Sequence, residues 1–459
     1  MSGQTSSHLG CAEFRRNIRA DRRSFLKAGL LGSAGLSLAN LLRAEAANSA
    51  SSQPHTSVII LWMRGGPSHI DMWDLKPDAP AEYRGEFRPI ETTVPGIHIC
   101  EHLPRSAALM EKWSIIRSLN HSDPGHSSGD QLLFTGYPTG RIPEENIAPS
   151  CGAVVSRQLG HLNPTLPSYV AIPKTMPGMG AAYLGAQHQP FETIVDPAIR
   201  GPFRLPDFTL DKGLSLARLA SRRELVRGFD ALRRDIDQSG QMTSLDTFDR
   251  QAAEILTSSA ARDAFDLDRE PSYIRERYGI TDRFNPRMPA GGGLPGWNQR
   301  ILLARRLVEA GVRLVTVDVR WWDTHQDNFY SLRAGFLPRW DQAYSALIED
   351  LSNRGLLEST LVVAWGEFGR SPKISPDAGR DHYPFVFSAA LAGGPVKGGR
   401  VIGASDTKAA FPARDPHSPQ DVLATIYRHL GVDSSVSYLD YFGRPRPVLQ
   451  DGTPVSALF

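Results

Sequence analysis

Four short, almost uninterrupted apolar runs occur along the chain, and glycine or polar residues end each of them. They lie at 57–63, 313–319, 361–365 and 385–391. Continuous apolar runs of this length are typical of strands that are buried on both faces, as in a parallel sheet. We therefore predict that these four segments are strands at the centre of a sheet.

Stretches with apolar residues at helical spacing accompany these runs. They lie at 298–311, 341–353 and 418–431. The third has Ser418 in a helix N-cap position and Pro419 at the first helical position. Strands that alternate with amphipathic helices predict an α/β fold, with a largely parallel central sheet and helices on both faces.

The first 46 residues have the order of an export signal. A basic region ends in Arg-Arg-Ser-Phe-Leu-Lys at 22–27, a moderately apolar stretch follows at 28–42, and Ala-Glu-Ala at 44–46 suits a signal peptidase. The Arg-Arg core resembles a twin-arginine signal, which is an address that a receptor recognises. We predict a twin-arginine signal peptide over 1–46, the export machinery as a partner, and a periplasmic or extracellular location. An amphipathic helix or a retained anchor is the alternative.

The rest of the chain is expected to form a linker at 47–54 and one domain at 55–459. Within that domain, roughly 190–296 is rich in Arg, Asp and Gly and has weaker apolar runs, which predicts a helical insertion. The formal charge is +2, but residues 1–46 contain seven Lys or Arg and three Asp or Glu, which leaves −2 for the remainder. The domain therefore lacks the basic excess of a nucleic-acid-binding protein.

Neither a membrane span nor a cysteine metal site is expected in the mature chain. No stretch approaches the ~20 consecutive apolar residues that a membrane span requires. No CxxC pair occurs, which disfavours a cysteine zinc site. Cys100 and Cys151 would both remain after export, and the sequence leaves open whether they are bonded or are two free, buried thiols.

Clusters of histidine and carboxylate residues lie next to the predicted strands. Three follow a strand, at 64–74, 321–328 and 366–370, and a fourth precedes one, at 379–382. A fifth cluster is at 121–130. Ligands of parallel sheets gather beyond the carboxyl ends of the strands. We therefore expect these clusters to form one shared polar site.

Histidine and carboxylate together suit zinc, manganese or iron, whereas carboxylates alone suit magnesium or calcium. Two such ions can hold the attacking and leaving oxygens of an ester displacement. Some of the candidates have a structural alternative, such as capping a helix or pairing with an arginine. The candidate metal ligands are His69, Asp71, Asp323, His325, Glu367, Asp381 and His382.

Five further residues are candidates for catalysis. Arg64 and Arg370 could clamp an anionic ester oxygen, or form structural salt bridges. Ser127 and Ser128 lie where a helix is expected to start, so they are candidate nucleophiles or only caps. His126 is a candidate proton carrier or ligand.

Taken in order, these motifs resemble the DUF1501 family. They are Gly-Gly-Pro-Ser-His-x-Asp at 65–71, Asp-Thr-His-x-x-Asn at 323–328, Gly-Glu-Phe-Gly-Arg-x-Pro at 366–372 and Gly-Arg-Asp-His at 379–382. The family is uncharacterised and is grouped with the alkaline phosphatase and sulfatase superfamily. The resemblance covers nearly the whole domain and implies an alkaline phosphatase-like fold.

The resemblance also implies roles for individual residues. Asp323 and His325 would match an Asp and a His ligand of the superfamily, His382 would match its last histidine ligand, and the nucleophile would fall near 127–128.

The chain departs from the superfamily at two places. Arg-Gly-Gly at 64–66 stands where the superfamily has an Asp ligand, and Glu-Phe at 367–368 stands where it has Asp-His. These departures put the number of metal ions and the chemistry in question. No Cys or Ser begins a C/S-x-P-x-R motif, which disfavours a formylglycine-type sulfatase.

The sequence thus favours an exported, metal-dependent hydrolase of phosphate or sulfate esters. Its expected cofactor is a divalent metal such as zinc, manganese or calcium, and its expected partner is an anionic ester substrate on a polysaccharide or a lipid. The alternative is a non-catalytic binding or assembly protein that retains the sulfatase-like fold. A carbohydrate-processing enzyme that uses Asp and Glu without metal is a third possibility.

Overall fold

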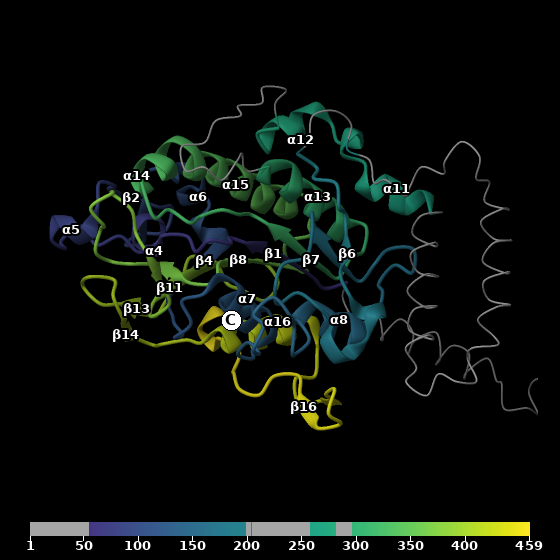
Figure 1. Cartoon of the computed structure of the whole chain (residues 1–459). Helices are drawn as coiled ribbons and strands as arrows, with labels where there is room; N and C mark the ends of the chain where they lie inside the picture. Colours follow the sequence, from purple (N-terminus) through teal and green to yellow (C-terminus); the bar gives the residue numbers. More distant parts are fainter. Residues whose placement is uncertain (1–54, 199–202, 204–257, 281–295) are drawn as a thin grey trace, which may run out of the picture. The chain divides into compact units, whose positions relative to one another are not determined.

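The computed structural model describes residues 55–198, 203, 258–280 and 296–459 (Figure 1). The predicted signal at 1–46 and the predicted linker at 47–54 lie outside the described residues, as does much of the predicted insertion. His55–Phe459 forms one compact unit.

An eight-stranded sheet in the order β12-β4-β11-β8-β1-β7-β5-β6 forms the centre of this unit. All neighbouring strands are parallel except at β11, which is antiparallel to both β4 and β8. The predicted α/β fold with a largely parallel sheet is therefore confirmed. The strands are β1 Ser57–Trp62, β4 Trp113–Leu119, β5 Tyr169–Ile172, β6 Phe191–Glu192, β7 Leu314–Asp318, β8 Thr360–Trp365, β11 Phe387–Ala392 and β12 Val401–Ile402.

The central strand β1 shows why continuous apolar runs form this sheet. It pairs with β7 on one side and β8 on the other, and all six of its residues are buried. Because side chains alternate between the two faces of a strand, Ile59 and Leu61 belong to one apolar core, while Val58, Ile60 and Trp62 belong to the other.

Helices cover both faces of the sheet, as predicted (Figure 1). On one face α13 Trp297–Glu309 packs on β1 and β7, and α15 Leu337–Asn353 packs on α13. On the other face α7 His126–Thr135, α8 Cys151–Leu159 and α16 Pro419–Leu430 contact one another or the sheet. The start of α16 has a full capping box, with Ser418 as its N-cap.

Short helices and two-stranded ribbons complete the unit. The helices are α4 His69–Met72, α5 Ala81–Arg84, α6 Pro104–Ala107, α11 Ser259–Phe265, α12 Ser272–Arg277 and α14 Asn328–Ser331. The ribbons are β2 Pro89–Glu91 with β3 His98–Cys100, β9 Gly369–Arg370 with β10 His382–Tyr383, β13 Ala404–Ser405 with β14 Pro412–Arg414, and β15 Ser437–Leu439 with β16 Pro445–Pro447.

A buried ion pair holds the described part of the predicted insertion, which includes α11 and α12, against the helices of the body. The fully buried guanidinium of Arg305 in α13 contacts Glu270 at 2.7 Å and Asp350 of α15 at 2.9 Å. Breaking one partner of such a network leaves a buried charge without compensation, which is strongly destabilising.

Cys100 and Cys151 are free and buried, so the disulfide that the sequence left open does not form. Burial raises the pKa of both thiols to about 12. Among the described residues, no helix has both the length and the apolarity to cross a membrane.

Candidate metal centre

The topology of the sheet brings four distant segments to one edge. Asp323 follows β7, Glu367 follows β8, and His126 is the first residue of α7, which comes after β4. The carboxyl ends of these three parallel strands point to the same edge. His382 precedes β11, and because β11 is antiparallel to its neighbours, the residues that precede it reach that edge as well.

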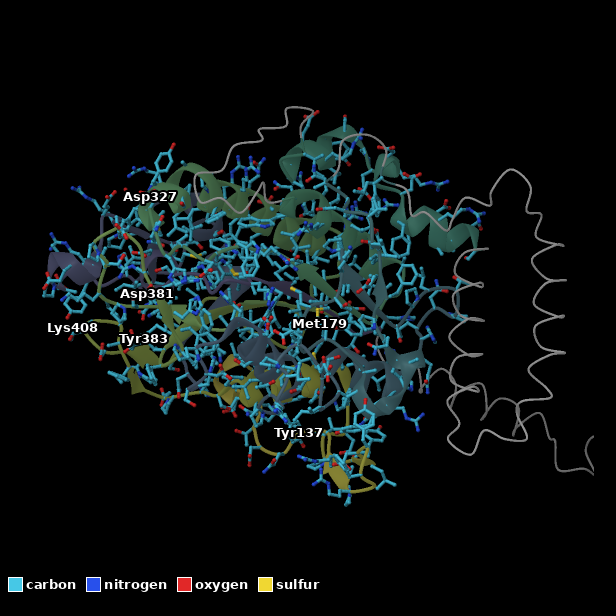
Figure 2. The ribbon with its side chains drawn as sticks, in the orientation of Figure 1. Tyr137, Met179, Asp327, Asp381, Tyr383 and Lys408 are labelled. Carbon is cyan, nitrogen blue, oxygen red and sulfur yellow. The ribbon has the colours of Figure 1, made fainter. Side chains whose placement is uncertain are left out.

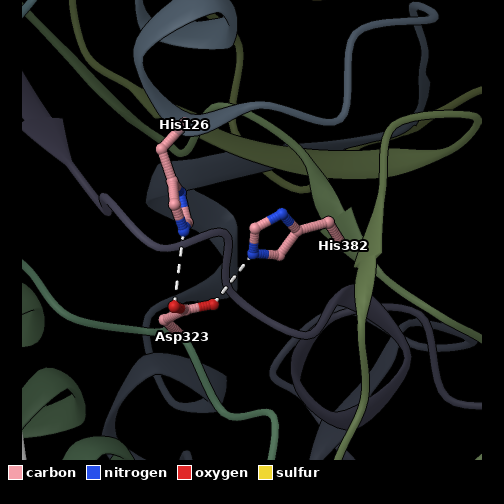
Figure 3. A group of neighbouring side chains, drawn as sticks. All are labelled: His126, Asp323 and His382. Atoms are coloured by element: carbon pink, nitrogen blue, oxygen red, sulfur yellow. Dashed lines mark hydrogen bonds and ion pairs between the residues drawn. The ribbon is translucent and has the colours of Figure 1, made fainter.

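Two histidines and one aspartate form the centre of this cluster. Single ligand atoms of His126, Asp323 and His382 lie within 4.8 Å of one another. Asp323 lies between the two imidazoles, with Oδ2 3.3 Å from Nε2 of His126 and Oδ1 3.1 Å from Nε2 of His382 (Figure 3). All three residues are half-buried. The two imidazole nitrogens and the carboxylate oxygens are thus close enough to one another to bind a single metal ion.

The outer nitrogen of each imidazole is anchored to the protein. Nδ1 of His382 lies 2.8 Å from the carbonyl oxygen of Pro124, and Nδ1 of His126 lies 2.5 Å from Oε1 of Glu367. A carbonyl or carboxylate oxygen can only accept a hydrogen bond here, so each Nδ1 donates. In the neutral imidazole this leaves the lone pair on Nε2, the atom that faces Asp323. Ligating histidines in metal sites are oriented in this way.

A third imidazole repeats this arrangement at the more exposed side of the cluster. His325 donates from Nδ1 to Oδ1 of Asp381 at 2.7 Å. Its Nε2 lies 3.0 Å from Oδ1 of Asp323 and 3.0 Å from Nε2 of His382. Three imidazole Nε2 atoms therefore surround one carboxylate.

The charges of the cluster reinforce one another. Burial opposes the ionisation of Asp323, but the imidazoles of His126 and His382, which donate to it from Nε2 when they are protonated, and the buried guanidinium of Arg370 outweigh burial and hold the pKa of Asp323 well below the usual range. Burial likewise opposes the protonation of His126, but hydrogen bonds to Asp323 and Glu367 raise its pKa to about 9. A cation therefore occupies this position favourably, either as a proton on His126 or as a metal ion.

Glu367 supports the cluster from below. Its side chain is fully buried, and Oε1 accepts hydrogen bonds from the backbone N–H of Gly65 at 2.8 Å and from His126. Its Oε2 has no hydrogen-bond partner among the residues that the structure describes. A Cβ atom at Gly129 would lie 3.1 Å from Cβ of Glu367, so the glycine lets the first turn of α7 approach this carboxylate closely.

An arginine and a tryptophan flank the cluster. Nε of Arg64 contacts Oδ2 of the buried Asp130 at 2.7 Å, and its guanidinium lies over the ring of Trp321 at 4.8 Å. The same indole ring meets the ring of His126 edge-on at 5.3 Å. Burial and the nearby carboxylate of Glu367 raise the pKa of Asp130, although Arg64 opposes the shift.

Comparison with known proteins identifies the family of this chain. The model of a family described as "Protein of unknown function (DUF1501)" matches residues 55–459. The chain belongs to the DUF1501 family. No curated protein matches it significantly.

Three solved structures are similar to this DUF1501 protein. A lipoteichoic acid synthase from Listeria monocytogenes is 8% identical, with 83% of this chain and 73% of that chain covered and a TM-score of 0.34. A sulfatase from a Pseudoalteromonas species is 14% identical, with 89% and 72% covered and a TM-score of 0.35. A phosphonate monoester hydrolase from Silicibacter pomeroyi is 12% identical, with 87% and 74% covered and a TM-score of 0.35.

The other predicted ligand pair of this DUF1501 protein lies apart from the cluster. Asp71 accepts two hydrogen bonds from Arg380, at 2.8 and 3.1 Å, one from Ser68 at 2.6 Å and one from Asn328 at 2.9 Å. His69 is buried, with Nε2 3.1 Å from the carbonyl oxygen of Ala409, and burial lowers its pKa. Both side chains belong to the packing beneath the site, and we leave them out of the ligand set proposed below.

Neither predicted serine occupies the first position of the helix. His126 begins α7, after Gly125 as the N-cap. Ser128 donates its hydroxyl hydrogen to Oδ1 of Asp123 at 2.5 Å, while Ser127 is half-buried. In this arrangement the imidazole of His126, the first residue of the helix, contacts Asp323.

Arg370 lies beneath the cluster. It is fully buried and donates to the carbonyl oxygens of Gly65, Gly66 and Arg380, as well as to Asp323. A guanidinium with these partners fixes the position of Asp323 and leaves little capacity to clamp a substrate.

The structure thus gathers five of the predicted ligands of this family member in one place, together with His126. The five are Asp323, His325, Glu367, Asp381 and His382. The sequence did not indicate Arg380 as the partner of Asp71, although Arg380 adjoins the predicted ligands at 381 and 382. It gave no sign of the Pro124 carbonyl, because a backbone acceptor carries no residue signature.

Proposed function

We propose that this DUF1501 protein is a metal-dependent hydrolase of phosphate or sulfate esters that binds one divalent cation through His126, Asp323 and His382. The observation that carries the proposal is the convergence of two imidazole nitrogens and one carboxylate within 4.8 Å, with the far nitrogen of each imidazole anchored. A ligand set of two nitrogens and one oxygen suits zinc or manganese better than calcium, which prefers oxygen ligands.

The residues around the centre suit an anionic ester. A divalent ion of this kind, when bound, supplies Lewis acidity and charge compensation at an ester oxygen. Arg64, fixed through its Nε atom to Asp130 and stacked on Trp321, is placed to bind an anionic oxygen with its remaining nitrogens. His325, oriented by Asp381, is placed at the exposed side to donate or accept a proton.

The nucleophile in this proposal is water and not a serine. Ser128 is engaged with Asp123, and the first residue of the helix is His126. The Nε2 atom of His325 faces the cluster, where it can take a proton from an attacking water. Substitution of Ser127 and Ser128, the candidate nucleophiles of the sequence, by alanine tests this choice, because turnover should persist when water is the nucleophile.

A non-catalytic binding or assembly role is the competing function. The specific observation in its favour is that Arg-Gly-Gly at 64–66 stands where the related superfamily has an Asp ligand, which leaves a single cluster of three ligands among the described residues. Metal binding without turnover would support this alternative.

Cellular location and substrate also belong to the proposal. The twin-arginine pattern at 22–27 supports export to the periplasm or beyond, where ester-bearing polysaccharides and lipids are accessible. Replacement of Arg22 and Arg23 by lysine should leave the precursor in the cytoplasm, as shown by fractionation and immunoblotting. Unchanged export of that variant would contradict the twin-arginine route.

The central experiment measures metal content and turnover together. Protein purified without chelators should contain about one zinc or manganese per chain, and it should cleave p-nitrophenyl phosphate, p-nitrophenyl sulfate or bis-p-nitrophenyl phosphate. Chelation should abolish turnover, and the lost ion should restore it. Asp323→Asn should lose the ion, whereas Asp123→Asn, a matched change outside the cluster, should keep it. Absence of stoichiometric metal contradicts the metal site, and bound metal without turnover favours the binding role.

A further inference from the structure

A hairpin far from the centre carries an exposed apolar tip. The turn between β15 and β16 presents three large side chains that are 65%, 67% and 80% exposed, namely Leu439, Tyr441 and Phe442. Figure 1 shows β16 on a ribbon that extends from the α16 side of the sheet. We call residues 439–442 the hairpin tip. Scattered apolar residues on a surface are ordinary, but three together on a projecting turn indicate an interaction site.

The hairpin tip is held rigidly in this conformation. The carboxylate of Asp440 accepts hydrogen bonds from the backbone N–H groups of Phe442 at 2.9 Å and Arg444 at 3.0 Å. It also contacts the guanidinium groups of Arg444 at 2.8 Å and Arg446 at 3.4 Å. With one carboxylate fixing the turn, the apolar side chains stay exposed and are ready to bind without further ordering.

The base of the hairpin is fixed to the body at the end of α7 that is remote from the metal centre. The hydroxyl of Tyr137, two residues beyond α7, donates to the carbonyl oxygen of Pro447 at 2.6 Å. His126, at the other end of α7, belongs to the centre. A helix of ten residues is about 15 Å long. A partner on the hairpin tip therefore has no need to contact the metal centre.

Cations flank the apolar side chains. The guanidinium of Arg444 lies 4.9 Å from the ring centroid of Phe442, and its side chain is 59% exposed. The side chain of Arg446 is 39% exposed. Aromatic and aliphatic side chains flanked by arginine are the composition of segments that enter the interface of an anionic bilayer.

We propose that the hairpin tip docks this protein on an anionic lipid surface, with Leu439, Tyr441 and Phe442 inserted among the headgroups and Arg444 against lipid phosphate. Size favours this occupant over a protein. A stable protein interface requires about 800 Å² and 20–30 residues from each partner, whereas the projecting tip offers three apolar side chains. A bilayer interface accepts such a small apolar insertion. The inference does not depend on the hydrolase proposal.

The test compares vesicle binding by matched variants of the full chain. Flotation with vesicles of phosphatidylcholine and phosphatidylglycerol should recover the wild-type chain. Leu439→Ser with Phe442→Ser should reduce the partition coefficient at least about tenfold, since each apolar side chain contributes substantially to insertion. Phe385→Ser with Phe411→Ser, a matched pair of exposed aromatics away from the hairpin, should have little effect.

A local probe separates the hairpin tip from the N-terminal segment of the same chain. In a Cys11→Ser background, an environment-sensitive fluorophore on Phe442→Cys should shift to the blue with anionic vesicles, and one on Phe411→Cys should not. Absence of the shift at 442, or equal binding to pure phosphatidylcholine, overturns the proposal. A self-association in sedimentation velocity that the Leu439→Ser/Phe442→Ser pair abolishes, without vesicle binding, would assign the tip to a second copy instead.

Discussion

Two aspartates with similar neighbours in sequence have opposite surroundings in this structure. Asp71 is fully buried, and Arg380, Ser68 and Asn328 saturate its carboxylate with hydrogen bonds. The side chain of Asp323 is 29% exposed, and the Nε2 atoms of three imidazoles surround it. The Nδ1 atom of each ring, on the side away from Asp323, donates a hydrogen bond that orients the imidazole.

The comparison indicates which property distinguishes the ligand site that we propose from a structural pair. Around Asp71 every contact comes from a donor, and one of these donors is the cationic guanidinium of Arg380, so no metal ion is needed. Around Asp323 the Nε2 atoms of His126, His325 and His382 each carry a lone pair when the imidazole is neutral. Few hydrogen atoms are then available to these nitrogens and to the carboxylate that they face. A site with too many acceptors and partial exposure attracts a cation, whereas a closed and satisfied pair does not.

Removal of Asp71 should have the largest effect, and it should fall on stability. Asp71→Ala leaves the buried guanidinium of Arg380 without its counter-ion, which should lower the free energy of unfolding by about 3–5 kcal/mol. Urea unfolding followed by circular dichroism measures the change. The double variant Asp71→Leu/Arg380→Met should recover much of it, because no buried charge then remains. Loss of bound metal with unchanged stability would place Asp71 in the ligand set.

Removal of the charge on Asp323 should act mainly on metal affinity. Asp323→Asn removes an anionic ligand, so we expect at least about 100-fold weaker zinc or manganese binding, or about 2.7 kcal/mol. Competition with a chromophoric chelator measures the affinity. Because asparagine keeps an acceptor oxygen for the buried guanidinium of Arg370, which also donates to three backbone carbonyl oxygens, the free energy of unfolding without metal should fall less than in Asp71→Ala. A large loss of stability would make the two aspartates equivalent and break the comparison.

Glu367 should have an intermediate effect, because it acts through His126. Glu367→Gln removes the charge that polarises Nδ1 of His126, and loss of such a support typically weakens metal binding about 10–100-fold. The same chelator competition measures it, with Asp123→Asn as a control near the start of α7. Affinity equal to that of the wild type would mean that His126 is oriented without this carboxylate.

The smallest effect concerns the pH dependence of the metal-free protein. The pKa of His126 is raised to about 9 from 6.5, so its proton stabilises the folded state. That contribution is fully present below pH 6.5 and is lost as the pH rises through 9. Allowing for partial exposure, it should be about 1–2 kcal/mol. Urea unfolding with chelator at several pH values measures it, and Asp323→Asn should flatten the dependence. A stability that rises across this range would contradict the assignment.

Much of the fold was predictable because it depends on local pattern. The apolar run at 57–63 is β1, and Ser418 and Pro419 begin α16 as predicted. The polar residues Ser114 and Arg117 interrupt the apolar pattern of β4, so its sequence gave no clear strand signal. The predicted strand at 385–391 exists as β11, but an apolar run carries no information on direction, and its antiparallel course came from the structure alone.

The candidate site was predictable in its residue types and only partly in its pairings. Histidine and carboxylate clusters next to strands indicated Asp323 and His382. The pairing of Asp71 with Arg380 joins residues 309 positions apart, and neither motif predicts which carboxylate forms an ion pair with the arginine. Because tertiary packing decides that pairing, the structural role of Asp71 becomes visible only in the folded structure, and the ligand role of Asp323 is a proposal that rests on its surroundings there.

The short ribbon that carries His382 has one further consequence. In this ribbon His382 is paired with Arg370, and Arg380 lies two residues before His382. The backbone that carries this proposed ligand is therefore held by two arginines whose guanidinium groups are fixed in the core. For the metal site that we propose, this means that the folded body fixes the positions of the ligands before an ion binds. We therefore expect metal binding and folding to be separate events, unlike in small zinc domains whose chain orders around the metal. The metal-free chain should then be able to fold in one compartment and bind its ion in another.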